Sequence, residues 1–220
     1  MYGPAAVLAL FVAVSACTGA PPEATRVETE LVYVEDRNLG EIYEELSVSV
    51  HVEDADGIDD IVALHVVHDD EGLVWTAADG AWSRRTEGGT QLFVMDGLVT
   101  PDGEPLPRGR YRIIAVDAAG HEDEATTVVS DPPAAPETLS FPGLNIERNT
   151  FTVSGTFSEV VIYGYSEAGE FLGEFRLRPG QQRRFADVAW LRNRNQEVSL
   201  FVSSYDAEGG RYVRSGPYSR

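Results

Sequence analysis

The chain has 220 residues, of which 43% are hydrophobic, and a formal net charge of −19. All 17 basic residues are arginines, which excludes chemistry that needs a lysine, such as a P-loop, a pyridoxal Schiff base or a Ser-Lys dyad. The acidic excess lies in residues 1–131, with 7 arginines and 26 acidic residues, whereas residues 132–220 carry 10 of each. Because an acidic surface is repelled by phosphate backbones, we expect no nucleic-acid partner.

The amino-terminal segment has the pattern of a secretion signal. Ala5–Val14 is an uninterrupted apolar run of ten residues, which reaches about 15 Å as a helix, half of the roughly 30 Å core of a bilayer. It is therefore too short to span a membrane and has the length of a signal-peptide core. Val14-Ser-Ala16-Cys17 resembles the lipobox of bacterial lipoproteins, where a peptidase cuts before a lipidated cysteine.

The lipobox resemblance implies a signal peptide over residues 1–16, cleavage between Ala16 and Cys17, and a lipid on Cys17, the only cysteine of the chain. Residues 17–26 then form a polar tether, and the membrane is a partner through the lipid. Thr18, rather than an aspartate, fits outer-membrane sorting in the lipoproteins that the motif resembles. The alternative is an ordinary cleaved signal in which Cys17 has no role.

Beyond residue 27 the apolar residues alternate with a period of two. Leu46, Val48, Val50 and Val52 face one side of a predicted strand, with polar residues between them, as in a strand with one buried face. The other strands that this pattern predicts in the first half are 61–68, 73–76, 91–95, 111–116 and 125–129. No segment favours a long amphipathic helix, and short strands separated by Gly and Asp indicate a β-sandwich over residues 27–131.

Three prolines within residues 132–136 interrupt this pattern and predict a semi-rigid linker. The same plan then repeats over residues 137–220, with predicted strands at 150–154, 160–165, 171–177, 183–185, 198–202 and 211–214. The ends of the two halves are alike, because Asp117 and Gly120 recur as Asp206 and Gly209 at one offset of 89 residues. A repeat of this length matches a second sandwich rather than a solenoid unit.

At these residues the chain resembles the immunoglobulin-like and fibronectin-type-III-like modules of bacterial surface proteins, whose last hairpin has an aromatic residue, alternating apolar residues and Asp-x-x-Gly. The resemblance implies an all-β fold of two tandem antiparallel sandwiches, residues 27–131 and 137–220. The cysteine pair of antibody domains is absent, and the choice between the immunoglobulin and fibronectin topologies stays open.

The densest cluster of carboxylates comprises Asp54, Asp56, Asp59 and Asp60. Calcium takes several oxygen ligands, which alternating acids in a turn can supply. The spacing does not match an EF-hand, however, because Gly57 stands at position four and His65 at position twelve. Asp and Gly also favour turns for backbone reasons. We therefore expect an acidic turn and no cofactor, with a calcium site as the alternative.

Three aromatic residues of the acidic half are candidates for contacting a sugar or a peptide. Trp82 lies in the longest predicted polar loop, residues 77–89, Trp75 lies in an apolar run, and Tyr33 belongs to the same acidic half. Loops carry binding in such scaffolds, although a loop tryptophan commonly packs beneath its own loop. His65 and His68 are three apart on a strand, point to opposite faces and cannot share one metal.

The sequence contains no Gly-x-Ser-x-Gly, His-Glu-x-x-His or Cys-x-x-Cys motif, and we expect a protein that is not an enzyme. The combined prediction is a lipid-anchored protein of the bacterial cell envelope, at the outer membrane or cell surface. Its role is to bind an envelope protein or a glycan, or to support an assembly. The alternatives are a carbohydrate-binding or adhesion module that uses loop aromatics, an accessory subunit of an envelope assembly, and a hydrolase with converging acids.

Overall fold

A computed structural model describes residues 19–55, 57–78, 80–87, 90–192 and 197–219. The predicted signal peptide, the cleavage site at Ala16 and Cys17, and Asp56 lie outside the described residues. Within the described residues the regular structure is strand and 3₁₀-helix alone, so the prediction of an all-β sandwich fold is confirmed. No helix among these residues is both long and apolar enough to cross a membrane.

The strands of the first half are β1 (Glu23–Asp36), β2 (Glu41–Glu53), β3 (Ile61–His68), β4 (Leu73–Ala78), β5 (Ser83–Glu87), β6 (Thr90–Leu98), β7 (Gly109–Asp117) and β8 (Glu122–Val129). Those of the second half are β9 (Gly143–Glu147), β10 (Thr150–Ser154), β11 (Val160–Ser166), β12 (Phe171–Leu177), β13 (Gln182–Arg184), β14 (Val198–Asp206) and β15 (Arg211–Ser219). Three single-turn 3₁₀-helices cover Ile58–Asp60, Pro136–Thr138 and Phe185–Asp187.

Several stretches differ from the sequence prediction, which names no strand where β1 (Glu23–Asp36) and β9 (Gly143–Glu147) form. The polar loop predicted over residues 77–89 is wrong for Ser83–Glu87, which forms β5 at the edge of a sheet. All five of its side chains are exposed, so β5 has no apolar alternation to reveal it and is held by backbone pairing with β6. Strand β1 also begins within the residues expected as a tether, because Glu23 and Ala24 already pair with Glu53 and Val52 of β2.

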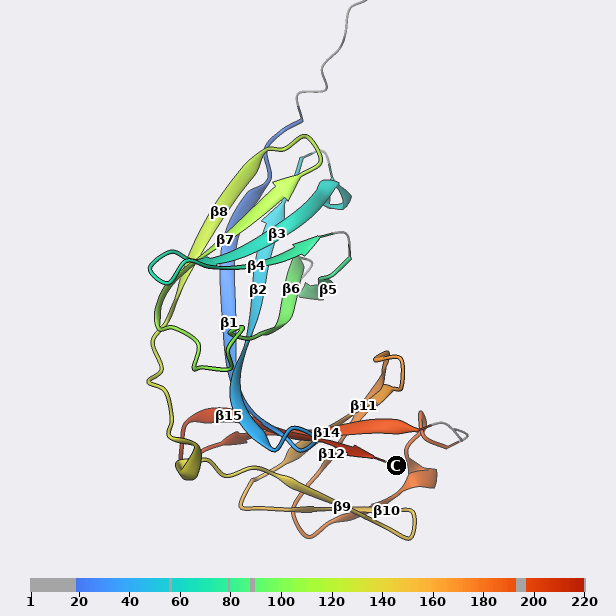
Figure 1. Cartoon of the computed structure of the whole chain (residues 1–220). Helices are drawn as coiled ribbons and strands as arrows, with labels where there is room; N and C mark the ends of the chain where they lie inside the picture. Colours follow the sequence, from blue (N-terminus) through green and yellow to red (C-terminus); the bar gives the residue numbers. More distant parts are fainter. Residues whose placement is uncertain (1–18, 56, 79, 88–89, 193–196, 220) are drawn as a thin grey trace, which may run out of the picture.

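Three sheets build the molecule. The largest has eight strands in the order β12-β11-β14-β15-β1-β2-β6-β5, and two smaller sheets have the orders β4-β3-β7-β8 and β13-β10-β9. The largest sheet joins both halves of the chain, because β1 pairs with β2 antiparallel along its length and with β15 in parallel over Val32–Asp36. Figure 1 shows the long β1–β2 hairpin running from the first half into the second. This shared sheet was not predicted from the sequence, and the ranges 27–131 and 137–220 stay predictions.

Two hydrophobic cores fill the space between the sheets. The first is built from residues between Ala24 and Val129, and the second from residues between Leu144 and Val213 together with Tyr33. Residues paired across strands share a face: Leu46 of the first core pairs with Leu31, and Tyr33, two residues further along, pairs with Val213 of the second core. Both cores therefore cover the same face of the eight-stranded sheet.

Tyr111 at the start of β7 is fully buried in the first core, and its hydroxyl donates a 2.7 Å hydrogen bond to the carbonyl of Pro107, four residues upstream. This is the arrangement of the tyrosine corner of Greek-key sandwiches. Burial raises the pKa of Tyr111 to about 12. The hydroxyl is therefore a neutral donor at physiological pH and holds the loop before β7 against the core.

Candidate functional site

The junction between the two halves is fixed by polar contacts to the linker. The Tyr33 hydroxyl donates to the carbonyl of Pro132 at 3.4 Å and accepts from the N–H of Ala134 at 3.0 Å. Arg108 donates to the carbonyl of Asp131 and makes a two-fold contact with the carboxylate of Glu44, each hydrogen bond 2.7 Å long. Residues 131–134 are thus held by β1, β2 and the loop before β7.

Glu44 and Arg108 form an ion pair in the interior of the junction. The side chain of Glu44 is 4% exposed and that of Arg108 18%, and Glu44 also accepts the N–H of Leu106 at 2.9 Å. Burial by itself lowers the pKa of Arg108, but the hydrogen bonds and charge of Glu44 outweigh it and raise that pKa. Arg108 therefore stays charged over the range of physiological pH.

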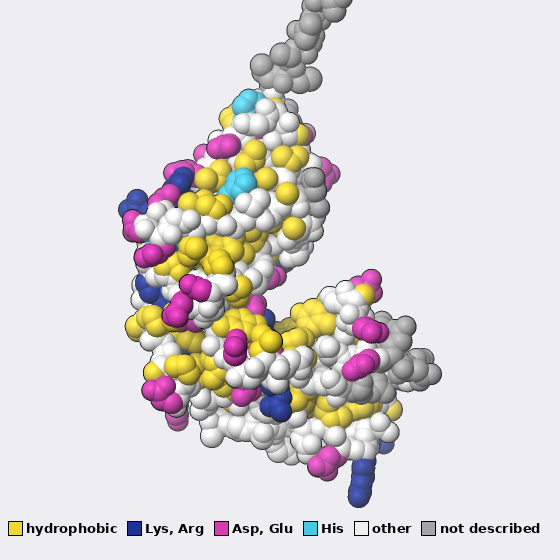
Figure 2. Space-filling view, in the orientation of Figure 1, with side chains coloured by type: hydrophobic (Ala, Val, Ile, Leu, Met, Phe, Trp, Pro, Cys, Tyr) yellow, Lys and Arg dark blue, Asp and Glu magenta, His cyan; other side chains and the backbone are white. Residues whose placement is uncertain are grey.

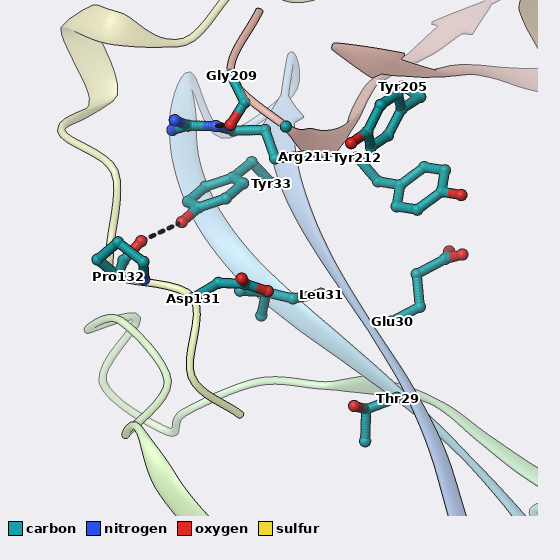
Figure 3. A pocket seen from close by; sticks show the side chains of 11 residues that line it. Thr29, Glu30, Leu31, Tyr33, Asp131, Pro132, Tyr205, Gly209, Arg211 and Tyr212 are labelled. Atoms are coloured by element: carbon teal, nitrogen blue, oxygen red, sulfur yellow. Dashed lines mark hydrogen bonds between the residues drawn. The ribbon is translucent and has the colours of Figure 1, made fainter. Parts of the chain in front are cut away.

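A first cavity of about 390 Å³ lies beside this junction, between β1, the linker and the β14–β15 hairpin. Figure 3 shows Tyr33 beneath the Arg211 side chain, with Tyr205 and Tyr212 on the other side of β1. The Arg211 guanidinium lies 5.6 Å from the centroid of the Tyr33 ring. Tyr33, Asp131 and Pro132 of its lining take part in the junction contacts, whereas Tyr205 and Tyr212 are exposed.

A larger cleft of about 820 Å³ lies on the open face of the eight-stranded sheet, opposite the two cores. Figure 2 shows the molecule hollowed on one side between its two halves. Seven of the eight strands contribute side chains to the cleft, and β12 alone does not. Its lining residues are Glu30, Asp36, Asn38, Tyr43, Glu45, Ser47, Arg85, Asp96, Gly97, Tyr163, Tyr165, Ser166, Glu167, Gly169, Ser199, Phe201, Arg214 and Pro217.

Aromatic side chains form one wall of this cleft. The Tyr165 ring meets Phe201 edge-on, with centroids 5.7 Å apart, and Phe171 at the same distance. Phe171, the first residue of β12, is 57% exposed and lies outside the lining of the cleft. Burial raises the pKa values of Tyr43, Tyr163 and Tyr165, and these phenols are therefore uncharged at neutral pH.

Charged groups line the rest of the cleft. Arg214 of β15 donates to Glu45 of β2 at 2.8 Å, and this pairing raises the pKa of Arg214 although burial works in the opposite direction. Desolvation is the main reason why the pKa of Glu30 is raised, and the charge of Asp96 acts in the same direction. Shifted pKa values thus gather in the cleft, a feature that is typical of binding and catalytic sites.

The aspartates of the acidic turn, predicted as a candidate calcium site, do not all lie together in the structure. Asp54 and Asp60 lie close to Asp117 of β7, with one carboxylate oxygen of each within 4.8 Å of the others. Asp59 is not part of this group, because it forms an ion pair with Arg84 of β5. Asp117, the aspartate of the repeated hairpin motif, was not among the predicted ligands, since only the fold brings it to the turn.

Asp117 is 1% exposed and already has partners. Its carboxylate accepts the backbone N–H of His121 at 2.8 Å and lies 2.9 Å from the Nδ1 of the same residue. Burial on its own raises the pKa of Asp117, but the hydrogen bonds and charge of His121 outweigh it and lower that pKa. In this structure the aspartate therefore closes the β7–β8 turn.

The three aromatic residues predicted as ligand contacts do not come together. Tyr33 is 4% exposed in the second core. Trp75 packs against the first core, stacks on Tyr111 and donates to the carbonyl of Val99 at 2.8 Å. Trp82 lies next to β5 and packs against Phe93, with ring centroids 6.0 Å apart. Sequence reasoning missed the cleft tyrosines, which lie on strands far apart in the chain.

No protein-family model matches the chain, and no curated protein matches it. Among solved structures, dimeric latent PorU from Porphyromonas gingivalis matches with 13% sequence identity and a TM-score of 0.35. The match covers 94% of this chain and 20% of that one, so the chain spans about a fifth of the length of the solved protein. A similarity of this degree carries no inference about activity or partners.

Proposed function

We propose that this chain is a lipid-anchored binding protein of the bacterial cell envelope, that it is not an enzyme, and that its ligand occupies the cleft of the eight-stranded sheet. One observation carries the proposal: side chains from both halves line a single open cleft, in which aromatic rings and charged groups with shifted pKa values lie together. Concave surfaces with a few polar groups among apolar ones are the usual sites of ligand binding.

The anchor rests on Val14-Ser-Ala16-Cys17, and the orientation of β1 is compatible with it. Strand β1 starts at the end of the first half that points away from the second half (Figure 1). Residues 17–22 reach at most about 20 Å when extended, so a lipid on Cys17 would hold the first half near the membrane and leave the second half further out. In the variant Cys17→Ser we expect an unprocessed precursor without lipid label. A variant that still matures and stays with the membranes refutes the anchor.

The binding site is tested in intact cells by site-specific photocrosslinking. Asn38 lies at the rim of the cleft and is exposed, so a benzophenone amino acid at this position reaches a ligand without filling the cleft. Asp70, exposed in the turn between β3 and β4 and outside the cleft, is the matched control position. We expect an adduct from position 38 and none from position 70. Equal labelling at both positions, or none at either, refutes the cleft as the binding site.

An accessory role in an envelope assembly is the second candidate, favoured by Phe171. This side chain is exposed on β12, an edge strand of the largest sheet. An exposed edge with an apolar residue is a surface onto which another strand can pair. Phe171→Glu would weaken such an assembly and leave adduct formation from position 38 unchanged.

A further inference from the structure

The charges that line the cleft are unbalanced. Five of the lining residues are acidic and two are arginines, which gives a formal charge of −3. Two of the acids have partners: Glu45 pairs with Arg214, and Asp36 accepts the backbone N–H groups of Asn38 and Leu39. Within the described part of the chain, the side-chain carboxylates of the other three, Glu30, Asp96 and Glu167, have no hydrogen bond and no ion pair, although the charges of Arg214 and Arg85 act on Glu30. These three carboxylates are available to a ligand.

Glu30 and Asp96 form the centre of this excess. They come from β1 and β6, on either side of β2, and the charge of Asp96 acts to raise the pKa of Glu30. The charge of Arg214 lowers the pKa of Glu30 and that of Arg85 does so to a smaller extent, yet desolvation prevails and that pKa stays raised. A positive group placed between these two carboxylates would offset both their mutual repulsion and the desolvation of Glu30.

The aromatic wall adds a second attraction for the same kind of group. Tyr43, Tyr163 and Tyr165 line the cleft as neutral phenols, next to Phe201. A guanidinium or ammonium group within about 6 Å of such a ring is attracted to its face. Carboxylates and aromatic faces on one surface therefore favour cations over neutral or anionic ligands.

We propose that the cleft binds a segment of a partner protein that carries arginine or lysine side chains, with one cation seated between Glu30 and Asp96. This inference rests on the proposed function and names the chemistry of its ligand. The cleft crosses seven strands and is open, so it admits a chain rather than an enclosed small molecule. A glycan would use the same rings but gains nothing from the unbalanced negative charge, and we favour the basic peptide on that ground.

The inference is tested by fluorescence anisotropy with the full chain in an uncharged polyoxyethylene detergent. The probe is a labelled Gly-Arg-Gly-Arg-Gly-Arg-Gly peptide, and its match has citrulline at each arginine, which keeps the shape and removes the charge. We expect the arginine peptide to bind at least tenfold more tightly than the citrulline peptide. We also expect its affinity to fall as salt is raised, because salt screens exposed charges.

Two double variants with the same change of charge locate the site. Glu30→Gln/Asp96→Asn should weaken binding of the arginine peptide at least tenfold, whereas Asp70→Asn/Glu71→Gln, in an exposed turn outside the cleft, should leave it within twofold. Glu167→Gln, in the β11–β12 turn, provides a single change that leaves every strand intact and should weaken binding several-fold. Thermal melts establish that each variant is folded.

Several results overturn the inference. These are equal affinity for the arginine and citrulline peptides, no binding of either, and equal losses in the two double variants. Binding of chitohexaose that is abolished by Tyr163→Ala also overturns it, in favour of a glycan. If the benzophenone at position 38 still forms its adduct, the proposed function stands and only the cationic ligand fails. If that adduct is missing as well, both proposals fail.

Discussion

The two halves of the chain share the eight-stranded sheet, but only in the first half do the described core residues come from one continuous stretch of sequence. Every residue of the first core lies between Ala24 and Val129. The second core needs Tyr33, and its sheet needs Val32–Asp36, which pairs with β15 from a position about 180 residues earlier in the chain. A boundary at the proline-rich linker thus assigns most core residues to one half or the other. It does not divide the eight-stranded sheet, because β1 and β15 are hydrogen-bonded to each other.

The largest expected effect comes from cutting the chain at this linker. The sequence alone favours a second half that folds by itself, whereas the pairing of β1 with β15 leads us to expect that residues 137–220 lack a cooperative melting transition. In that fragment β15 becomes an unpaired edge and the site of Tyr33 is empty. Residues 19–131 retain the whole first core and should melt cooperatively in circular dichroism. Cooperative melting of residues 137–220 would show that the second half folds without β1.

A large effect is also expected from the ion pair at the junction. Glu44→Gln removes the charge that faces Arg108 and leaves the guanidinium poorly compensated inside the protein. Losing one partner of a buried pair costs about 3–5 kcal/mol of the free energy of unfolding, and we expect about 3 kcal/mol because glutamine keeps one acceptor. Chemical denaturation measures this loss. The control is Glu124→Gln, whose partner Arg112 lies at the surface. If the control variant loses as much free energy of unfolding as Glu44→Gln, the expectation is wrong.

Comparison of the predicted strands with the structure shows which features can be recognised in a short stretch of sequence and which depend on distant residues. Alternating runs such as Leu46–Val52 and Tyr111–Val116 predict their strands, because one face of each is buried. Strand β5 escapes detection, since Ser83–Glu87 contains no apolar residue and no buried side chain. The candidate site escapes for a different reason. Glu30 and Arg214 meet in one cleft only because β1 pairs with β15, and no short window of sequence contains that pairing.

A smaller loss of stability is expected when either of the two buried tyrosine hydroxyls, of Tyr33 and of Tyr111, is removed, and the two losses should differ. Tyr33→Phe keeps the ring in the second core but loses two hydrogen bonds to the linker, whereas Tyr111→Phe loses one to Pro107. At about 1 kcal/mol for each hydrogen bond, we expect Tyr33→Phe to cost about 2 kcal/mol. It should also speed proteolysis of residues 131–136, because it frees the linker.

The matched result is that Tyr111→Phe costs about 1 kcal/mol and leaves cleavage of the linker unchanged. Timed digestion with a low amount of protease distinguishes the two variants. If linker cleavage is equally fast in both, the Tyr33 hydroxyl does not hold the halves together.

Acid should act on the first half through Asp117. Its pKa is lower in the folded protein than in the unfolded chain, so its contribution is complete above the unfolded value of about 4 and is lost as the pH falls through the lower folded value. Asp117→Asn keeps an oxygen that can accept from His121 but loses the charge. We expect a melting temperature a few degrees lower at pH 7 and a difference from the parent that shrinks towards pH 3. A constant difference over this range would show that the charge is irrelevant.

The smallest expected effect is that of calcium, and the same half provides the comparison. Residues 1–131 carry the whole net charge of −19, so their carboxylates repel one another in the folded state and monovalent salt should raise the melting temperature. Calcium requires six to eight oxygens. Asp54, Asp60 and Asp117 offer three carboxylates, and Asp117 is already bonded to His121. We therefore expect millimolar calcium, added at high salt, to raise the melting temperature little.

The contrary result would be a large calcium-specific shift. Calcium at a hundredfold excess over the Kd of a specific site would add about 2.7 kcal/mol to the free energy of unfolding, which raises the melting temperature by at least about 5 °C for a chain of this size. A shift of that size that disappears in Asp54→Asn/Asp60→Asn would make the acidic turn a metal site.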